Sequence, residues 1–218
     1  TTVVKNKFHS NIKVNIVVYD LGLTDEESEK IKLYPDIIVE KFNFSLYPEH
    51  VSLEKYNGLN CNYSWKPIII QEVCEKYNNM IYWIDTQCLL SDFTNLLNIL
   101  NKNYIYTPIS SGLVSLWTHE TTLKYMDAYK YTSYSSRSAG VFAINYNIEW
   151  CKELVKEWKN LALIKECICP EGSDRSNHRQ DQAILSILYH KYQEKHRFKI
   201  IDELVGIKIH QSLDEKYM

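Results

Sequence analysis

Strand-sized apolar runs alternate with helical patterns along this chain of 218 residues. Residues 13–19 and 37–41 have the composition of strands, and Thr24 and Glu27 between them have the spacing of a helix capping box. A strand, a helix and a second strand in succession are typical of a parallel β-α-β unit. The sequence therefore predicts an α/β fold with a mixed, mostly parallel central sheet flanked by helices.

The same alternation continues towards the C-terminus. Apolar periodicity predicts helices over residues 64–77, 91–100 and 148–161 and from 180 onward, and it predicts strands over 80–84, 104–108, 112–117 and 141–144. Residues 165–179 form a polar segment, and loops of that length inside a compact domain are usually functional or disordered. A chain of this size fits a single domain, so we expect residues 1–218 to fold as one unit.

Charge and hydropathy exclude two classes of partner. The formal net charge is −2 and no block of Lys and Arg occurs, which argues against nucleic-acid binding. The apolar runs are much shorter than the ~20 residues of a transmembrane helix, and no signal-peptide core precedes the first strand. We expect a soluble protein, with the cytoplasm as one candidate location. The Thr-Thr start indicates that the chain could be an excised domain.

The chain has 6 cysteines at irregular spacing. Mostly reduced thiols are expected, because a chain of this length does not need disulfides to be stable, although a disulfide framework is the alternative. Cys167 and Cys169 with His178 form a possible zinc site. The single residue between the two cysteines is, however, a poor spacing for chelation.

Two segments carry candidate chemistry at strand ends. Asp85 follows the apolar run Trp83-Ile84, and a carboxylate at the end of a buried strand faces the crevice where open α/β sheets bind ligands. It could equally cap the next turn. Gly140 precedes the buried run 141–144, where a small residue permits close approach of a sugar or phosphate or forms a plain turn.

A third candidate segment opens the last predicted helix. Residues 178–182 bring together a histidine, an arginine, a carboxylate and two amides. Asp181 and Gln182 are candidate catalytic residues there. Asp181 is also a favourable residue for the first turn of a helix, which explains its position without a catalytic role.

The order of these segments resembles GT-A-type glycosyltransferases, with closer similarity to an uncharacterised glycosyltransferase-like family of nematodes and giant viruses. The matching pieces span roughly residues 14 to 190, and the most specific is the last. They are Tyr19-Asp20-Leu21-Gly22, Trp65-Lys66-Pro67, Trp83-Ile84-Asp85, Trp117-Thr118-His119 and Cys167-Ile168-Cys169-Pro170-Glu171-Gly172-Ser173 through His178-Arg179-Gln180-Asp181-Gln182. The resemblance implies a single GT-A-like (Rossmann-like) domain.

The resemblance also implies roles at the matching positions. The loop of Tyr19 and Asp20 would line the nucleotide pocket, and Gly140 would lie beside the donor sugar. Asp181 and Gln182 would face the donor sugar or the acceptor. The activity implied is transfer of a sugar, expected to be UDP-linked, from a nucleoside diphosphate sugar to a hydroxyl of a glycan or protein acceptor.

The implied cofactor is a divalent metal, Mn²⁺ or Mg²⁺. Asp85 would be the first residue of the metal-binding Asp-x-Asp pattern, and His210 resembles the late histidine of some such metal sites. Gln87 departs from the pattern, because it stands where a second aspartate is usual and its amide oxygen binds a divalent cation more weakly. Metal dependence is therefore an open point of the sequence.

The implied mechanism needs positive charge at the leaving diphosphate, from a metal on Asp85 or from Lys66, Arg137 or Arg179. Asp181 would act as base in an inverting reaction or stabilise an oxocarbenium-like state in a retaining one. Trp117 and His119 are candidates to border the acceptor site, or are core residues.

Two other functions are compatible with parts of this pattern. A nucleotide- or carbohydrate-binding module without turnover is the main alternative, because of Gln87. A Rossmann-type oxidoreductase or methyltransferase would need a glycine-rich turn after the first strand, and residues 20–23 offer one glycine there.

Overall fold

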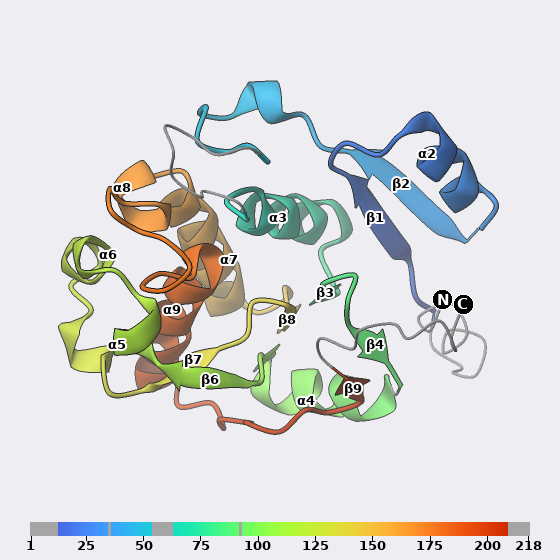
Figure 1. Cartoon of the computed structure of the whole chain (residues 1–218). Helices are drawn as coiled ribbons and strands as arrows, with labels where there is room; N and C mark the ends of the chain where they lie inside the picture. The colour runs from blue at the N-terminus through green and yellow to red at the C-terminus, as the bar shows by residue number, and fades with distance from the viewer. Residues whose placement is uncertain (1–12, 35, 54–62, 92, 209–218) are drawn as a thin grey trace.

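The computed structural model describes residues 13–34, 36–53, 63–91 and 93–208. At its N-terminal side, β1 (Ile16–Asp20) and β2 (Ile37–Lys41) pair in parallel, joined by α2 (Asp25–Lys32). Thr24 and Glu27 form the predicted capping box at the start of α2. This β-α-β unit lies beside α3 (Trp65–Tyr77) in Figure 1. The first part of the sequence prediction is confirmed.

The central sheet has three strands, in the order β3 (Met80–Ile84), β8 (Val141–Asn145) and β5 (Ile105–Tyr106). β8 is antiparallel to both neighbours. The prediction of a mostly parallel central sheet is therefore wrong, since β1 and β2 make the only parallel pairing among the described strands. β8 is buried along its whole length, as parallel strands usually are, and burial does not reveal strand direction.

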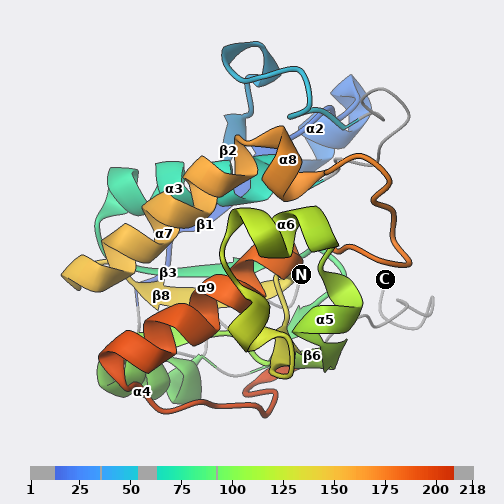
Figure 2. The same ribbon diagram turned by 90° about the vertical axis from the view of Figure 1, so that its left-hand side faces the viewer.

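Helices cover both faces of this sheet. Phe142 and Ile144 of β8 pack into one apolar cluster with α3, α7 (Glu149–Ala162) and α9 (Gln180–His196). Val141 and Ala143 face the opposite side, where they pack with α4 (Thr94–Asn103). Figure 2 shows α3 and α7 above β3 and β8, with α4 below them. The prediction of an α/β fold with helices flanking the sheet is confirmed.

Shorter elements surround this core. β4 (Leu89–Leu90) pairs with β9 (Ile207–Lys208), and β6 (Ile109–Leu113) pairs with β7 (Ser135–Arg137). The remaining elements are η1 (Phe44–Leu46), α5 (Val114–Trp117), α6 (Glu120–Tyr125), η2 (Tyr129–Tyr131) and α8 (Lys165–Ile168). The strand predicted over 112–117 is thus wrong from Val114 onward, because α5 begins there.

Four cysteines are buried free thiols, namely Cys74, Cys88, Cys151 and Cys167. Burial raises the pKa of the Cys167 thiol to about 12, which keeps it protonated and unreactive. Cys169 is disulfide-bonded, so the expectation of mostly reduced thiols holds for these four and not for Cys169. Within the described segments, no helix is both long and apolar enough to cross a membrane.

Candidate active site

Lys66, Asp85 and Asp181 form one buried charge cluster. The Lys66 Nζ atom lies 3.0 Å from Asp85 Oδ1 and 3.2 Å from Asp181 Oδ2. The Lys66 and Asp181 side chains are only 3% and 5% exposed, whereas Asp85 is 30% exposed. A ligand arriving from solvent therefore meets the Asp85 carboxylate first.

The fold brings these residues together from three elements. Lys66 lies in the first turn of α3, Asp85 follows β3, and Asp181 lies in the first turn of α9. The Asp85 N–H donates to the Gly140 carbonyl at 2.8 Å, which extends the β3–β8 pairing past the end of both strands. The sequence-predicted residues Lys66, Asp85, Gly140 and Asp181 are thus in one place.

Gly140 is required by the position of the Asp85 carboxylate. A Cβ atom at residue 140 would lie 3.0 Å from Asp85 Oδ2. That contact is tighter than most real Cβ contacts, so a side chain here would require the carboxylate to move by a few tenths of an ångström. Lys66 Nζ also lies 3.4 Å from the carbonyl oxygen of Ala139, so the segment before β8 contacts two of the three charged residues.

Aromatic residues hold Asp85 and Lys66. The Trp83 indole N–H donates to Asp85 Oδ1 at 2.8 Å. The Lys66 ammonium lies 5.1 Å from the centre of the Tyr63 ring and 5.8 Å from that of Trp83, within the range of cation–π attraction. The role of Trp83 was not predicted from the sequence, although residues two apart in a strand point to the same face.

Burial and mutual repulsion determine the charge of the cluster. Desolvation raises the pKa of Asp181 to about 6, with Lys66 opposing this and Asp85 adding to it. Burial by itself would lower the pKa of Lys66, but the two carboxylates outweigh it and the pKa is raised. Once Asp181 is ionised, well above its pKa of about 6, the formal charges of the three side chains sum to −1.

The start of α9 is held by contacts outside the cluster. The Trp158 indole N–H donates to the Asp181 carbonyl at 3.1 Å. The Gln182 amide donates to the hydroxyl oxygens of Ser136 at 3.1 Å and Ser110 at 3.4 Å. Gln182 therefore joins α9 to the β6–β7 pair. It follows Asp181 in the chain but takes no part in the ion pairs of the cluster.

His178 is a structural residue in this fold. Its Nδ1 accepts the His119 backbone N–H at 3.2 Å, which leaves Nε2 to donate to the Ile168 carbonyl at 3.0 Å. Burial lowers the pKa of His178 to about 4, so the ring is neutral at pH 7. Both ring nitrogens of His178 are thus engaged in hydrogen bonds, and neither is available to bind zinc together with Cys167 and Cys169. No group of three or more His, Cys, Asp or Glu residues in the described part of the chain is placed to hold a metal.

Arg137 and Arg179 are engaged elsewhere. The Arg179 guanidinium lies 3.8 Å from the centre of the Trp117 ring. Arg137 is buried, pairs with Asp202 and donates to the carbonyl of Ile201 at 2.8 Å, so it fixes the segment after α9. Lys66 is thus the one predicted cation that the structure places in the cluster.

Tyr19 and Asp20 lie at the end of β1. The Tyr19 hydroxyl donates to Glu72 at 3.2 Å, and its ring packs in the same apolar cluster as Trp83. Asp20 accepts the N–H groups of Leu23 and Gly22 at 2.6 and 2.8 Å, and these bonds lower its pKa. Asp20 thus shapes the turn after β1 and Tyr19 joins β1 to α3, and the predicted role of both at the nucleotide stays a prediction.

The three predicted metal ligands are not gathered in the described structure. Asp85 is in the cluster, where its carboxylate already pairs with Lys66, and Gln87 is exposed in the turn that follows. His210 lies outside the described residues. The described residues thus do not form a chelating set around Asp85, and divalent-metal binding stays a prediction.

No protein-family model and no curated protein sequence matches the chain. Among solved structures, its fold is similar to that of the apo structure of the WbbM bifunctional glycosyltransferase, with a TM-score of 0.50 and 14% sequence identity. The match covers 80% of this chain and 31% of that one, so the chain spans less than a third of that protein. A glycosyltransferase-like fold is supported, and the resemblance to a nematode and giant-virus family stays a prediction.

Proposed function

We propose that the chain is a glycosyltransferase that moves a sugar from a nucleoside diphosphate sugar, UDP-linked by expectation, to a hydroxyl of a glycan or protein. The observation that carries the proposal is the Lys66–Asp85–Asp181 cluster, at the meeting point of the sheet with α3 and α9. Buried ionisable groups with altered pKa values are concentrated at functional sites. The glycosyltransferase-like fold supports the same activity.

The charge of the cluster suits the chemistry of glycosyl transfer. Positive charge develops on the sugar as its bond to the diphosphate breaks, and a net charge of −1 nearby stabilises it. Asp181 is only 5% exposed, which favours an electrostatic role over direct contact with an acceptor hydroxyl. In the proposed mechanism Asp85 faces the donor, and Asp181 orients Lys66 and adds negative charge.

The leaving diphosphate needs a cation, and two sources are proposed. The first is Lys66, whose buried ammonium lies 3.0 Å from Asp85, so its positive charge would act at short range on a diphosphate bound beside Asp85. A divalent ion on Asp85, with Gln87 as a weaker partner, would supply the same neutralisation when bound. These alternatives predict different metal requirements.

A second candidate is a catalytically inactive module that binds a nucleotide or carbohydrate on the same fold. It is favoured by the ion pair between Asp85 and Lys66, which neutralises the carboxylate that a metal-dependent enzyme would use. Gln87 in place of a second carboxylate supports it as well. Such a module would bind the donor without releasing free diphosphate.

Thermal unfolding with UDP-, GDP- and dTDP-sugars, with and without Mn²⁺, tests donor binding. A ligand at ~100 times its dissociation constant adds about 2.7 kcal/mol, which gives a measurable shift in Tm. Asp85→Asn should abolish the shift, whereas Asp25→Asn, in the exposed first turn of α2, should keep it. The proposal fails if no nucleotide sugar stabilises the wild type, or if Asp85→Asn responds as the wild type does.

A further inference from the structure

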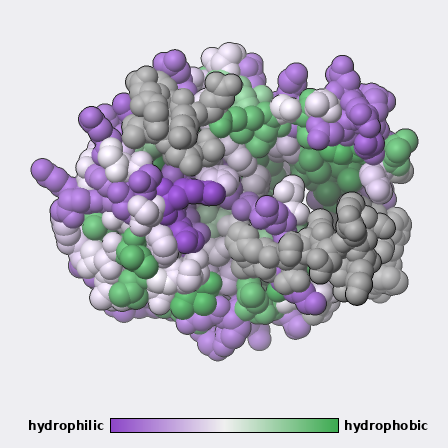
Figure 3. Space-filling view, in the orientation of Figure 1, coloured by the Kyte–Doolittle hydropathy of each residue, from purple (hydrophilic) through white to green (hydrophobic). Residues whose placement is uncertain are grey.

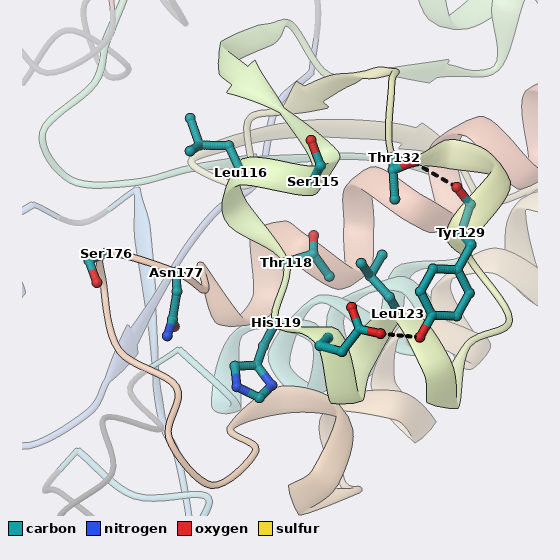
Figure 4. Close-up of a pocket in the computed structure, with 10 residues that line it drawn as sticks. Ser115, Leu116, Thr118, His119, Leu123, Tyr129, Thr132, Ser176 and Asn177 are labelled. Carbon is teal, nitrogen blue, oxygen red and sulfur yellow. Dashed lines mark hydrogen bonds between the residues drawn. The ribbon is translucent and has the colours of Figure 1, made fainter.

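A second site lies beside the charge cluster, in a groove of about 640 Å³. Its walls come from α5, α6, η2 and the loop before α9, as Figure 4 shows. Hydrophobic side chains lie on the same face of the molecule, over α5 and β6 (Figure 3). Among the residues of these two elements, Leu113 of β6 is 45% exposed and Leu116 of α5 is 52% exposed. The face is thus exposed, partly apolar and hollowed.

The lining of the groove is rich in hydroxyl and amide groups and poor in charge. Hydroxyls and amides come from Ser115, Thr118, Thr132, Ser176 and Asn177. Glu120 is the one formally charged residue of the lining, and the lining contains no Lys or Arg. A phosphate or other anion would meet no cation in this lining. The Thr132 and Ser176 hydroxyls already donate to Tyr129 and Asp174, so they present acceptor lone pairs to the hydroxyls of a neutral polyhydroxylated molecule.

Individual groups in the groove are suited to hold hydroxyls. The Thr118 side-chain oxygen is buried and has no hydrogen-bond partner among the described residues. His119 Nδ1 accepts the Thr121 N–H at 3.2 Å, so its Nε2 carries the proton and is a donor. Glu120 receives the Tyr129 hydroxyl on one carboxylate oxygen, and its second oxygen can accept from a ligand. The Tyr129 ring is 46% exposed and offers a flat apolar surface.

Two connections place the groove next to the cluster. The Arg179 N–H donates to the Trp117 carbonyl at 3.0 Å. Asp181 is two residues after Arg179, so the backbone atoms of these two residues are at most about 7 Å apart. On the other side, Arg175 donates to the Tyr63 hydroxyl at 3.0 Å. The Tyr63 ring lies 5.1 Å from Lys66, so the loop that lines the groove also reaches the aromatic surround of the cluster.

We propose that this groove binds a neutral oligosaccharide and is the acceptor subsite of the enzyme. The assignment as an acceptor subsite rests on the proposed function. The acceptor would then be a neutral glycan and not a phosphorylated substrate. The sugar would stack on Tyr129 and Leu116 and donate hydroxyls to Glu120. Its reactive end would point along the segment 179–181 towards the cluster.

The test is binding of maltotriose, cellotriose and chitotriose to the full chain, with a sialylated trisaccharide and an uncharged peptide as comparators. We expect a neutral trisaccharide to bind, with an affinity about tenfold lower in Tyr129→Ala because aromatic contacts contribute at this level. Glu120→Gln should weaken binding severalfold by removing a charge-assisted acceptor. Tyr125→Ala is the matched control, because Tyr125 is 51% exposed on α6 and lies outside the lining.

The groove assignment is overturned if no neutral trisaccharide binds, if only the sialylated probe or the peptide binds, or if Tyr129→Ala binds as tightly as Tyr125→Ala. Asp85→Asn separates this proposal from the proposed function. It should leave trisaccharide binding unchanged while it abolishes nucleotide-sugar binding. A wild type that binds the trisaccharide and no nucleotide sugar would refute the transferase and leave a carbohydrate site in the groove.

Discussion

Replacing Asp181 by Asn should change how stability depends on pH. The pKa of Asp181 rises from its ordinary 3.8 to about 6 on folding, so the folded state holds this proton more tightly than the unfolded state. Stability from this group is present below pH 4 and is lost as the pH rises through 6. The difference between the two pKa values corresponds to about 3 kcal/mol.

His178 acts in the opposite direction over nearly the same range. Its pKa falls from 6.5 to about 4 on folding, so the unfolded state binds the proton more tightly. Stability from His178 is present above pH 6.5 and is lost as the pH falls through 4, again by about 3 kcal/mol. The two effects nearly cancel, and the wild type should show little net change from these groups between pH 4 and 7.

Urea unfolding from pH 4 to 7 measures this directly. In Asp181→Asn only the His178 effect remains, so the variant should gain about 3 kcal/mol relative to the wild type as the pH rises. Asp174→Asn is the control, because Asp174 has a lowered pKa and titrates below this window. A constant difference between Asp181→Asn and the wild type across the range would refute the assignment of a raised pKa to Asp181.

Three further substitutions test the geometry of the cluster. Lys66→Met should lower the free energy of unfolding in urea by about 3–5 kcal/mol, because it leaves two carboxylates without their partner. Adding Asp181→Asn should recover part of this loss. Equal stability of the single and double variants would contradict this expectation. Trp83→Phe removes the hydrogen bond to Asp85 and should lower the unfolding free energy by about 1–2 kcal/mol, and an unchanged value would show that the bond contributes nothing. Gly140→Ala should weaken nucleotide-sugar binding about tenfold by displacing Asp85, measured by calorimetry, with wild-type affinity as the refuting result.

The sequence predicted most helices and the location of the buried strands, because their signals are local. The capping box of Thr24 and the apolar stripe of α7 are contained in single segments. Strand direction is not a local property: β8 has the continuous apolar composition of a parallel strand and is antiparallel to both neighbours. The run from Val114 to Trp117 shows the same limit, because so short an apolar segment fits a strand or a helix equally well.

For the candidate site, the sequence identified the residues better than their partners. Asp85, Gly140 and Asp181 were predicted as ligand-facing residues, and the fold brings them together with Lys66. It could not show that Lys66 pairs with both carboxylates, because the three residues come from separate segments and Asp181 lies in the other half of the chain. For the same reason the sequence could not show the structural role of His178, because its partners, His119 and Ile168, come from two other segments.

The central claim is that the Lys66–Asp85–Asp181 cluster is the active site of a glycosyltransferase. The most direct measurement is release of free nucleoside diphosphate from the nucleotide sugar that gives the largest Tm shift, with neutral oligosaccharides present. We expect release by the wild type and by Asp25→Asn. The rate should be at least about a hundredfold lower for Asp85→Asn, which is a typical effect of removing an electrostatic group from an active site. Equal rates for Asp85→Asn and the wild type would contradict the claim.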